Sequence, residues 1–380
     1  MKILLVHYDE LDTLGGVELL VRQLAGAFTE AGHPTGVVEM GSRWRGRRPL
    51  TSAVPIWTIA AASFPTWARP RSWASAARAT LHLRRAIREW GAEILHIHFP
   101  IGQSIPAVGA HALPHRWRLA VTVHNSEIRV APQSDPRVGV WQRRLFARAD
   151  VVSAVSGSML ADTCRQYPRV ETKGVVIYNG IGEYWLEEPR RPVPRSGQAY
   201  VLFVGRLHPM KGVDLLLRAW REISGSLPGL ELRIAGEGPD GPALRRMVQG
   251  WNLSGSIRFL GAVDNHALQP LYSEAEAVVL PSRAEGFPLT LLEASACGSL
   301  CLGSDVPGIA EIIADGRTGF LFPSGSPEGL SDKLRMMMGL DREVAFRIRS
   351  AAYQQVKERF TRPKMIAEYL DMYRGVLGTT

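Results

Sequence analysis

Cysteine is scarce in this 380-residue sequence, and its scarcity excludes two kinds of protein. Three cysteines, Cys164, Cys297 and Cys301, are too few for a disulfide framework. Cys297 and Cys301 form a C-x3-C pair without further Cys or His at zinc spacing, so no metal site is expected there. We interpret them as small residues packed on a helix and on the strand that follows it.

The sequence also lacks an apolar run long enough to cross a membrane. Its longest, AVPIWTIAAASF at 53–64, falls short of the roughly 20 residues that a spanning helix needs. The opening MKILLVHYDE meets acidic residues too early for a secretory signal, whose apolar part takes roughly 7–15 residues. We therefore expect a soluble, cytoplasmic protein, either free or at the inner face of the plasma membrane.

Acidic residues are absent from residues 40–88, which hold ten arginines. Four tryptophans are interleaved with them: Trp44, Trp57, Trp67 and Trp73. An Arg- and Trp-rich surface suits an anionic membrane or an anionic ligand. A general preference for arginine combined with ordinary core tryptophans gives the same composition, so both interpretations stay open.

Apolar strands alternate with amphipathic helices along the whole chain. In the first half, strands are predicted at KILLVHY, TGVVEM, AEILHIHF, RLAVTVHN and DVVSAVS. In the second half, they are predicted at AYVLFVGRL, LELRIAG, IRFLG, AVVLPS, GSLCLGSD and GFLFPSG. Helices are expected between them, including one over IAEIIADG, and the chain closes with helices near 327–339, 341–360 and 363–377.

This alternation predicts an α/β fold with two doubly wound, Rossmann-like domains that face each other across a deep cleft. The Pro- and Arg-rich stretch EEPRRPVPRSGQ, residues 187–198, marks the expected boundary between them. Ligands of such sheets bind beyond the carboxyl ends of the strands. The residues that follow each strand are therefore the candidates for function.

Glycines and cations follow two of these strands. Gly15 and Gly16 come after the first strand and before a helix, where the backbone approaches a ligand closely and the helix terminus favours an anion. Arg206 and Lys211, in RLHPMKG, follow the strand AYVLFVG and also precede a helix. Two cations beside a helix terminus suit a diphosphate, and a pair of solvated surface charges is the alternative.

The stretch IAGEGPDG matches the dinucleotide-binding pattern G-x-G-x-x-G at Gly236, Gly238 and Gly241. Pro239 and Pro242 flank its turn, and the stretch lies in mid-chain rather than after a first strand. A nicotinamide dinucleotide is therefore a minor alternative.

Three histidines lie on or after strands. His96 and His98 share one face of AEILHIHF, and no third ligand at a suitable spacing supports a metal. His124 ends the strand AVTVHN and is followed by polar residues. We predict that His124 points into the cleft, whereas His96 is a packed strand residue.

Two acids, Glu285 and Glu293, flank the start of a helix in PSRAEGFPLTLLEASACG. Pro288 is expected in the first turn of that helix. One acid at the mouth of the site and one deeper suit two sets of hydroxyls, with backbone amides at the helix start holding negative charge between them. A ribose and a hexose joined by a diphosphate present this pattern, whereas a capping acid and an ordinary helix glutamate are the alternative.

The motifs together resemble the retaining GT-B glycosyltransferases of family 4, also called group 1. The resemblance covers essentially the whole chain and is most specific at R-x4-K and E-x7-E. It rests on LGGVE, HIHFP, TVHN, AVSGSML, IYNGI, VGRLHPMKG, IAGEGP, VVLPSRAEGFPLTLLEASACG and DVPGIAEIIADGRTGFLF. It implies a GT-B architecture with an acceptor-binding domain over 1–187, to which 361–380 return, and a donor-binding domain over 188–360.

The resemblance also implies roles for the side chains at the donor site. Glu293 would bind the ribose of a nucleotide-sugar donor, and Glu285 the hydroxyls of the donor sugar. Arg206 and Lys211 would hold the diphosphate. His124 matches the histidine that lies near the reacting sugar and the acceptor. His124, Glu285, Arg206 and Lys211 are thus the implied catalytic residues.

Backbone groups complete the implied donor site. Gly286, Phe287 and Leu289 would contribute contacts at the start of the helix, and Gly15 and Gly16 would approach the phosphates from the first domain. Pro288 departs from the family, in which many members carry glycine there; it removes a backbone donor and stiffens the loop.

No D-x-D metal motif occurs in the sequence. By the resemblance, no metal or other cofactor is needed, since cations and helix dipoles meet the diphosphate charge. Retention in this family is usually explained by front-face attack, in which a donor phosphate oxygen takes the acceptor proton. No side-chain nucleophile is then required.

The predicted function is transfer of a sugar from a nucleotide-diphosphate sugar to a saccharide or polyprenyl-linked acceptor, in bacterial cell-surface polysaccharide or glycolipid synthesis. Residues 40–88 would supply a peripheral contact with an anionic membrane. The alternatives are a GT-B relative such as a nucleotide-sugar epimerase or a phosphorylase, a basic nucleic-acid-binding protein and a non-catalytic scaffold. No nucleic-acid-binding signature accompanies the basic charge, so no nucleic-acid partner is expected.

Overall fold

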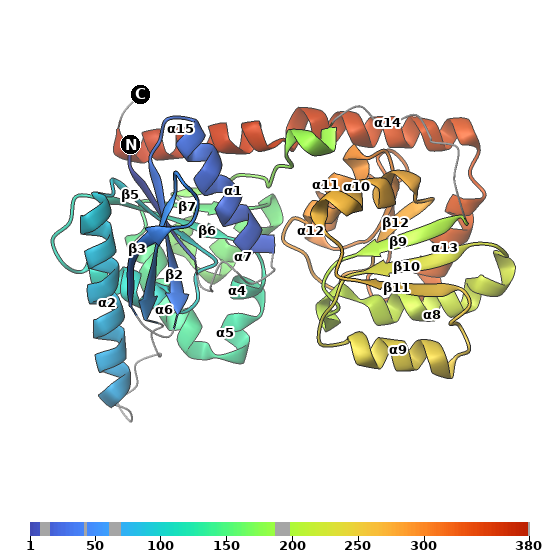
Figure 1. The fold of residues 1–380 in the computed structure, drawn as a ribbon, viewed down its shortest axis with the longest axis horizontal. Coiled ribbons are helices and arrows are strands. Elements are labelled where there is room, and N and C mark those ends of the chain that lie inside the picture. The colour runs from blue at the N-terminus through green and yellow to red at the C-terminus, as the bar shows by residue number, and fades with distance from the viewer. Residues whose placement is uncertain (8–15, 42–43, 61–69, 187–197, 379–380) are drawn as a thin grey trace. The chain divides into compact units, whose positions relative to one another are not determined.

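The computed structural model describes residues 1–7, 16–41, 44–60, 70–186 and 198–378. They form two compact units, shown in Figure 1: unit 1 is Met1–Tyr178 with Ile366–Thr380, and unit 2 is Asn179–Met365. The sequence predicted the first boundary between residues 187 and 188 and the return to the first domain at residue 361, whereas the structure places them after Tyr178 and at Ile366. At the first crossing, Trp185 packs edge-on against Tyr272, which places it with unit 2.

Unit 1 contains one mostly parallel sheet with strand order β3-β4-β2-β1-β5-β6-β7-β8. Its strands are β1 (Ile3–Val6), β2 (Thr35–Gly41), β3 (Arg45–Pro49), β4 (Pro55–Ala60), β5 (Ile94–His98), β6 (Arg118–Val123), β7 (Val151–Ala154) and β8 (Gly174–Val176). Its helices are α1 (Gly16–Glu30), α2 (Pro70–Trp90), α3 (Ser104–His111), α4 (Ser126–Arg129), α5 (Ala131–Ser134), α6 (Pro136–Arg148), α7 (Gly157–Gln166) and most of α15 (Arg362–Leu377).

Unit 2 contains a parallel sheet with strand order β11-β10-β9-β12-β13-β14. Its strands are β9 (Tyr200–Val204), β10 (Glu231–Ala235), β11 (Ile257–Gly261), β12 (Ala277–Leu280), β13 (Leu300–Ser304) and β14 (Phe320–Phe322). Its α-helices are α8 (Val213–Ile223), α9 (Gly241–Gly250), α10 (Asn265–Glu274), α11 (Leu289–Ala296), α12 (Pro307–Ala310), α13 (Pro327–Met338) and α14 (Arg342–Arg359). Helices α8, α9 and α13 pack together, as do α10, α11 and α14, so each face of the sheet is covered (Figure 1).

The central strands are buried from end to end, which is why they read as continuous apolar runs. Every residue of β1 and β12 is buried. Parallel pairing brings the carboxyl ends of neighbouring strands to one edge of each sheet, as the alternation of strands and helices predicts. The doubly wound α/β class predicted for both halves is confirmed.

The Trp- and Arg-rich segment contains an antiparallel pair of strands, β3 and β4, that the sequence did not reveal. Trp57 of β4 is fully buried and donates a hydrogen bond to Glu89 at 3.0 Å, and Trp44 packs against the core. The membrane interpretation was therefore wrong for Trp57, which core packing accounts for, whereas Trp44 is only partly buried. Trp73 on α2 is 43% exposed, and Trp67 lies outside the described residues.

The prediction of a helix over IAEIIADG was wrong. Helix α12 is a single turn that ends at Ala310. The chain then turns at Gly316, whose φ of 73° is in the left-handed region. Thr318 and Asp315 accept hydrogen bonds from the backbone amides of Ala314 (2.9 Å) and Leu321 (2.8 Å). These side chains accept hydrogen bonds from backbone amides, and such bonds compete with those of a continuing helix.

Helix α15 is fixed to the sheet of unit 1 by buried hydrogen bonds. His96 on β5 bonds the Tyr373 hydroxyl through Nδ1 (2.6 Å) and the Thr122 hydroxyl through Nε2 (2.7 Å). Burial lowers the pKa of His96 to about 3, so its ring is neutral and can donate one bond and accept the other. His96 is therefore a packed strand residue, as predicted, and it anchors the helix.

We expect Tyr373→Phe to lower the free energy of unfolding of unit 1 by ~1–3 kcal/mol, because a buried imidazole nitrogen loses its partner. Urea unfolding followed by circular dichroism measures the effect. Tyr184→Phe is the matched control, since the Tyr184 hydroxyl makes a solvent-exposed hydrogen bond to His266 O (3.2 Å), and it should change stability by less than ~0.5 kcal/mol. Equal losses in both variants would contradict the anchoring role.

Candidate active site

Two neighbouring strands of unit 2, β9 and β12, end in loops that carry the predicted donor-site residues. The backbone amide of Arg283, after β12, donates to Met210 O, after β9, at 2.8 Å. The Arg283 side chain reaches both oxygens of Asp214, on α8, at 2.8 Å each. A two-pronged pairing of this kind adds geometric specificity to the attraction. The two loops are thus held together across the edge of the sheet.

Glycines allow these loops to pack backbone against backbone. A Cβ at Gly212 would lie 2.0 Å from the carbonyl oxygen of Pro281, and Gly212 also has a φ of 65°. A Cβ at Gly308 would lie 2.4 Å from the carbonyl oxygen of Glu285. Both distances are below any real contact, so only glycine fits at either position.

Lys211 and Glu285 meet directly where these loops join. Lys211 Nζ lies 2.5 Å from Glu285 Oε1, and the Ser282 hydroxyl donates to the same oxygen at 2.6 Å. Glu285 is 6% exposed, so its charge is compensated within the protein. The sequence assigned these two side chains to different parts of a donor; in the structure they form one ion pair.

Arg206 follows β9 and is exposed. No ion pair or side-chain hydrogen bond of Arg206 is found within the described part of the chain. Its guanidinium is therefore the more accessible of the two predicted cations.

Helix α11 begins at Leu289, one residue later than expected, with Pro288 as the flanking residue in extended geometry. The expectation that Pro288 lies inside the first turn was wrong, although its missing amide is harmless at either position. Gly286 and Phe287 precede the helix. Phe287 is buried, its ring packs edge-on against Phe360, and its carbonyl accepts a hydrogen bond from Asn179 at 3.3 Å.

Glu293 lies within α11 and accepts a hydrogen bond from the Tyr272 hydroxyl at 3.1 Å. Burial raises the pKa of Glu293 to about 7, and the bond from Tyr272 offsets part of that rise. A carboxyl group with this pKa is a candidate for a functional site, because its burial lacks full compensation.

In unit 1, His124 follows β6 and lies among other ionisable side chains. His124 Nε2 is 3.3 Å from His98 Nδ1, and His7, after β1, bonds Glu18 of α1 at 3.1 Å. Burial, followed by the charge of His7, lowers the pKa of His124 to about 3. The imidazole of His124 is thus neutral near pH 7 and can both donate and accept a hydrogen bond.

The predicted glycines of unit 1 lie at the start of α1. Gly16 is the first residue of the helix, and Gly15 lies outside the described residues. Glu18, in the first turn, has a pKa below its ordinary value. Burial raises this pKa, but the hydrogen bond with His7 and the electrostatic effect of the nearby histidines together lower it by more.

Two of the three glycines of IAGEGPDG, Gly236 and Gly238, serve the packing of strand-end loops. A Cβ at Gly236 would lie 1.9 Å from Gly205 O, and one at Gly238 would lie 2.3 Å from Leu207 O. Asp240 N also donates to Leu207 O at 3.0 Å. Close approach of two backbones accounts for Gly236 and Gly238, whereas a Cβ at Gly241 would make only an ordinary contact with the Leu207 side chain at 3.5 Å. Two of the three glycines of the dinucleotide pattern thus have a structural explanation.

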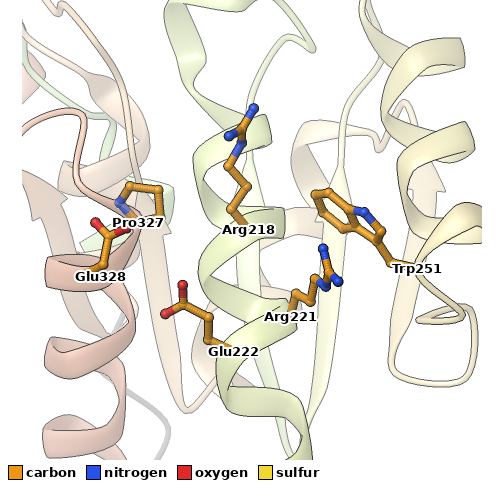
Figure 2. A pocket seen from close by; sticks show the side chains of 6 residues that line it. All are labelled: Arg218, Arg221, Glu222, Trp251, Pro327 and Glu328. Atoms are coloured by element: carbon orange, nitrogen blue, oxygen red, sulfur yellow. The ribbon is translucent and has the colours of Figure 1, made fainter.

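A hollow of about 400 Å³ lies elsewhere on unit 2 (Figure 2). Its walls are Arg218, Arg221, Glu222, Trp251, Pro327 and Glu328. Arg221 lies over the Trp251 ring at 5.1 Å. The arginines and Glu222 belong to the second half of α8, whereas Lys211 precedes the first turn of that helix, so the hollow is separate from the candidate site.

Among the described residues, no cluster of His, Cys, Asp and Glu is arranged to hold a metal ion. Cys297 and Cys301 are buried and unpaired by disulfide. None of the helices described is long and apolar enough to cross a membrane.

Comparison with known proteins assigns the family. The family profile "Glycosyl transferases group 1" matches residues 186–355, and "Glycosyltransferase Family 4" matches residues 14–182. The D-inositol 3-phosphate glycosyltransferase of Frankia alni is 35% identical over 288 residues, covering 68% of each chain. The chain belongs to the group 1, family 4 glycosyltransferases. It is therefore an enzyme that transfers sugars, and the epimerase, nucleic-acid and scaffold alternatives are not favoured.

Solved structures agree on the fold. Sucrose-phosphate synthase from Thermosynechococcus elongatus superimposes with a TM-score of 0.82 at 20% identity, covering 99% of both chains. Anabaena HepE, in complex with UDP-glucose, does so with a TM-score of 0.76 at 19% identity, covering 98% of this chain and 99% of its own. The GT-B architecture inferred from the sequence is confirmed.

Several side chains at the candidate site were not predicted. Tyr272 is 21 residues before its partner Glu293, on another helix, and nothing in its local sequence marks it. Glu18 and Glu127 carried weak signals, since one follows a glycine pair and the other comes three residues after His124. Arg283 and Asp214 meet only through the fold.

The raised pKa of Glu293 predicts a pH-dependent stability. The folded chain retains a proton on Glu293 that the unfolded chain loses above the ordinary pKa of 4.5, so this residue's contribution falls as the pH rises from 4.5 through about 7. Glutamine at this position cannot ionise. As the pH rises across that window, the free energy of unfolding of Glu293→Gln should therefore increase by ~1–3 kcal/mol relative to that of wild type.

Urea unfolding at several pH values tests this expectation. Glu328→Gln, an exposed position on α13, is the matched control and should follow wild type at every pH. A Glu293→Gln advantage that is the same at pH 4.5 and pH 8 would contradict the raised pKa.

Proposed function

We propose that this glycosyltransferase is a retaining, metal-independent enzyme that moves a sugar from a nucleotide-diphosphate sugar to a saccharide or lipid-linked acceptor, in cell-surface polysaccharide or glycolipid synthesis. The observation that carries the proposal is the Lys211–Glu285 ion pair at the joined ends of β9 and β12. It places a cation directly beside an acid that can accept hydrogen bonds from hydroxyl groups. A sugar diphosphate carries both an anionic group and hydroxyl groups, so it can bind both side chains.

On binding, the donor would replace the contact between Lys211 and Glu285 with contacts from each of them to the donor. Lys211 and the accessible Arg206 would meet the diphosphate, and Glu285 would accept hydrogen bonds from the sugar hydroxyls. Glu293, whose carboxyl has only partial compensation, would accept from the ribose. The amides of Gly286, Phe287 and Leu289 at the start of α11 add positive potential, so fixed protein charges take the place of a divalent ion.

The transfer step requires no side-chain nucleophile. The acceptor oxygen forms a bond to the anomeric carbon on the face from which the diphosphate departs, and the bond from that carbon to the phosphate oxygen breaks. The acceptor hydroxyl proton passes to an oxygen of the leaving diphosphate. Lys211 and Arg206 stabilise the negative charge that develops there.

By the family resemblance, His124 would lie near the reacting sugar and the acceptor. Because its imidazole is neutral, it can hydrogen-bond a sugar or acceptor hydroxyl without adding charge. By the same resemblance, Gly15 and Gly16 would contact the phosphates of the donor.

The first experiment is a metal-free thermal-shift and titration panel of UDP-, GDP-, ADP- and dTDP-glucose. The Anabaena neighbour holds UDP-glucose, which makes the uridine donor the first choice for the panel. We expect selective stabilisation by one member and a ~10- to 100-fold weaker Kd in Glu293→Ala, since a charged hydrogen bond is worth ~1.5–3 kcal/mol.

Glu328→Ala, which changes the hollow on α8 and α13, is the control and should bind like wild type. Binding that persists in Glu293→Ala and is lost in Glu328→Ala would move the donor to the hollow and overturn the assignment. Binding that requires a divalent ion would overturn the metal-free mechanism.

The exposed face of α2 supports a peripheral contact with an anionic membrane. Arg71, Arg78 and Arg85 are exposed along it, and Trp73 and Leu81 are 43% and 65% exposed. Basic residues beside exposed apolar ones are typical of helices that lie in the headgroup layer. A lipid-linked acceptor would then be met at the membrane surface.

Replacing Arg71 and Arg78 by Ser should weaken binding to vesicles that contain phosphatidylglycerol by ~10- to 30-fold at low salt, because each basic residue contributes ~1 kcal/mol. Vesicle flotation measures the binding, with pure phosphatidylcholine as the reference. Replacing Arg246 and Arg317, two exposed arginines of unit 2, removes the same charge and should have little effect. Equal losses for both pairs would indicate that net charge, and not this helix, determines the binding.

A further inference from the structure

Glu127 holds the backbone on which His124 sits. It follows β6 on the short helix α4 and is fully buried. One carboxylate oxygen accepts a hydrogen bond from the backbone amide of His124, and the other accepts from the amide of Asn125 at 2.9 Å. Both oxygens are therefore used to fix two consecutive peptide groups at the end of the strand.

Buried side-chain hydrogen bonds of Gln142 and Tyr167 support this arrangement. Gln142 on α6 donates to Glu127 O and to Pro100 O, both at 2.7 Å, and so joins the loops after β5 and β6. The Tyr167 hydroxyl in turn donates to the side-chain oxygen of Gln142 at 2.6 Å. Gln142 is fully buried, so its orientation is fixed by these three bonds.

The loop after β5 is held in an unfavourable conformation beside His124. Phe99 has a φ of 56°, which is uncommon for a residue with a side chain. The Gln103 side chain donates to His98 O at 2.7 Å and to Phe99 O at 2.5 Å. This geometry places the Phe99 ring 6.4 Å from that of His124. Strained backbone of this kind persists only where its surroundings determine it, and it concentrates at functional sites.

Burying a carboxylate here is unfavourable unless its charge is compensated. Burial raises the pKa of Glu127 to about 7, although the two amides and Arg129 offset part of that rise. Asp162 holds Arg129 at 2.6 Å, so that cation is shared. Removing the carboxyl group would leave the amides of His124 and Asn125 without their acceptor, so the bonds that it accepts offset part of the cost of its burial.

We propose that Glu127 is a positioning residue: by fixing the amides of His124 and Asn125, it sets the direction in which His124 presents its imidazole to the sugar transfer. This inference rests on the role proposed for His124 above. Gln142 and Gln103 hold the two adjoining loops and complete the arrangement.

The test compares Glu127→Gln, His124→Ala and the double variant with Val138→Ala. Val138 is buried on α6, so its truncation lowers stability without changing a hydrogen bond of this network. Hydrogen exchange followed by mass spectrometry measures protection of the amides at 124 and 125. Release of nucleoside diphosphate from UDP-, GDP-, ADP- and dTDP-glucose measures kcat and KM, with water as the acceptor.

In Glu127→Gln, one acceptor oxygen becomes a donor, so we expect at least ~10-fold faster exchange at these amides and a ~10- to 100-fold lower kcat with an unchanged donor KM. The double variant should lose no more than His124→Ala alone, because both changes affect one group. Val138→Ala should show neither effect.

Three outcomes would overturn the inference. Unchanged exchange at 124 and 125 would show that Glu127 does not hold the backbone. A normal kcat in Glu127→Gln, while His124→Ala is impaired, would overturn positioning and leave the proposed function intact. A normal kcat in His124→Ala would remove the proposed role of His124, and the inference with it, while the donor titrations would still test the rest of the proposed function.

Discussion

Close approach of backbones at the carboxyl ends of the parallel strands is the constraint on which the candidate donor site depends. Gly212 lies against Pro281, and Gly308 lies against Glu285, at distances that no side chain could occupy. The contact at Gly212 brings the loops after β9 and β12 close enough for Lys211 to reach Glu285 at 2.5 Å, and the contact at Gly308 packs α12, which follows β13, against the loop after β12. A larger residue at Gly212 would move the loops after β9 and β12 apart, and the Lys211–Glu285 ion pair would be lost without any change in the charged residues themselves.

The fold and the proximity of Lys211 to Glu285 were predictable because they depend on local order along the chain. Continuous apolar strands that alternate with helices require parallel sheets, and parallel sheets place the ends of their strands at one edge. Lys211 and Glu285 each follow such a strand, so their proximity follows from topology. His124 was selected on the same ground, and the structure places it at the end of β6.

What the sequence could not reveal depends on contacts between segments far apart in the chain. Tyr272 reaches Glu293 only because α10 and α11 pack together. Composition left open whether Trp57 lies on the surface or in the core, and pairing with β2 places β4 inside the sheet and buries it. Helix α12 ends after one turn because Thr318 and Asp315 bind backbone amides, an outcome that apolar periodicity cannot predict.

Two acids, the fully buried Glu127 and the partly buried Glu293, show how one physical effect leads to different chemistry. Burial raises the pKa of each to about 7. Glu127 directs both oxygens to backbone amides, which cannot move without moving the strand end, so its bonds favour rigidity. Glu293 is held by one phenolic hydroxyl, from Tyr272. Hydroxyl groups of a ligand can add to that bond and provide the compensation that the protein leaves incomplete, which is why Glu293 suits binding and Glu127 suits positioning.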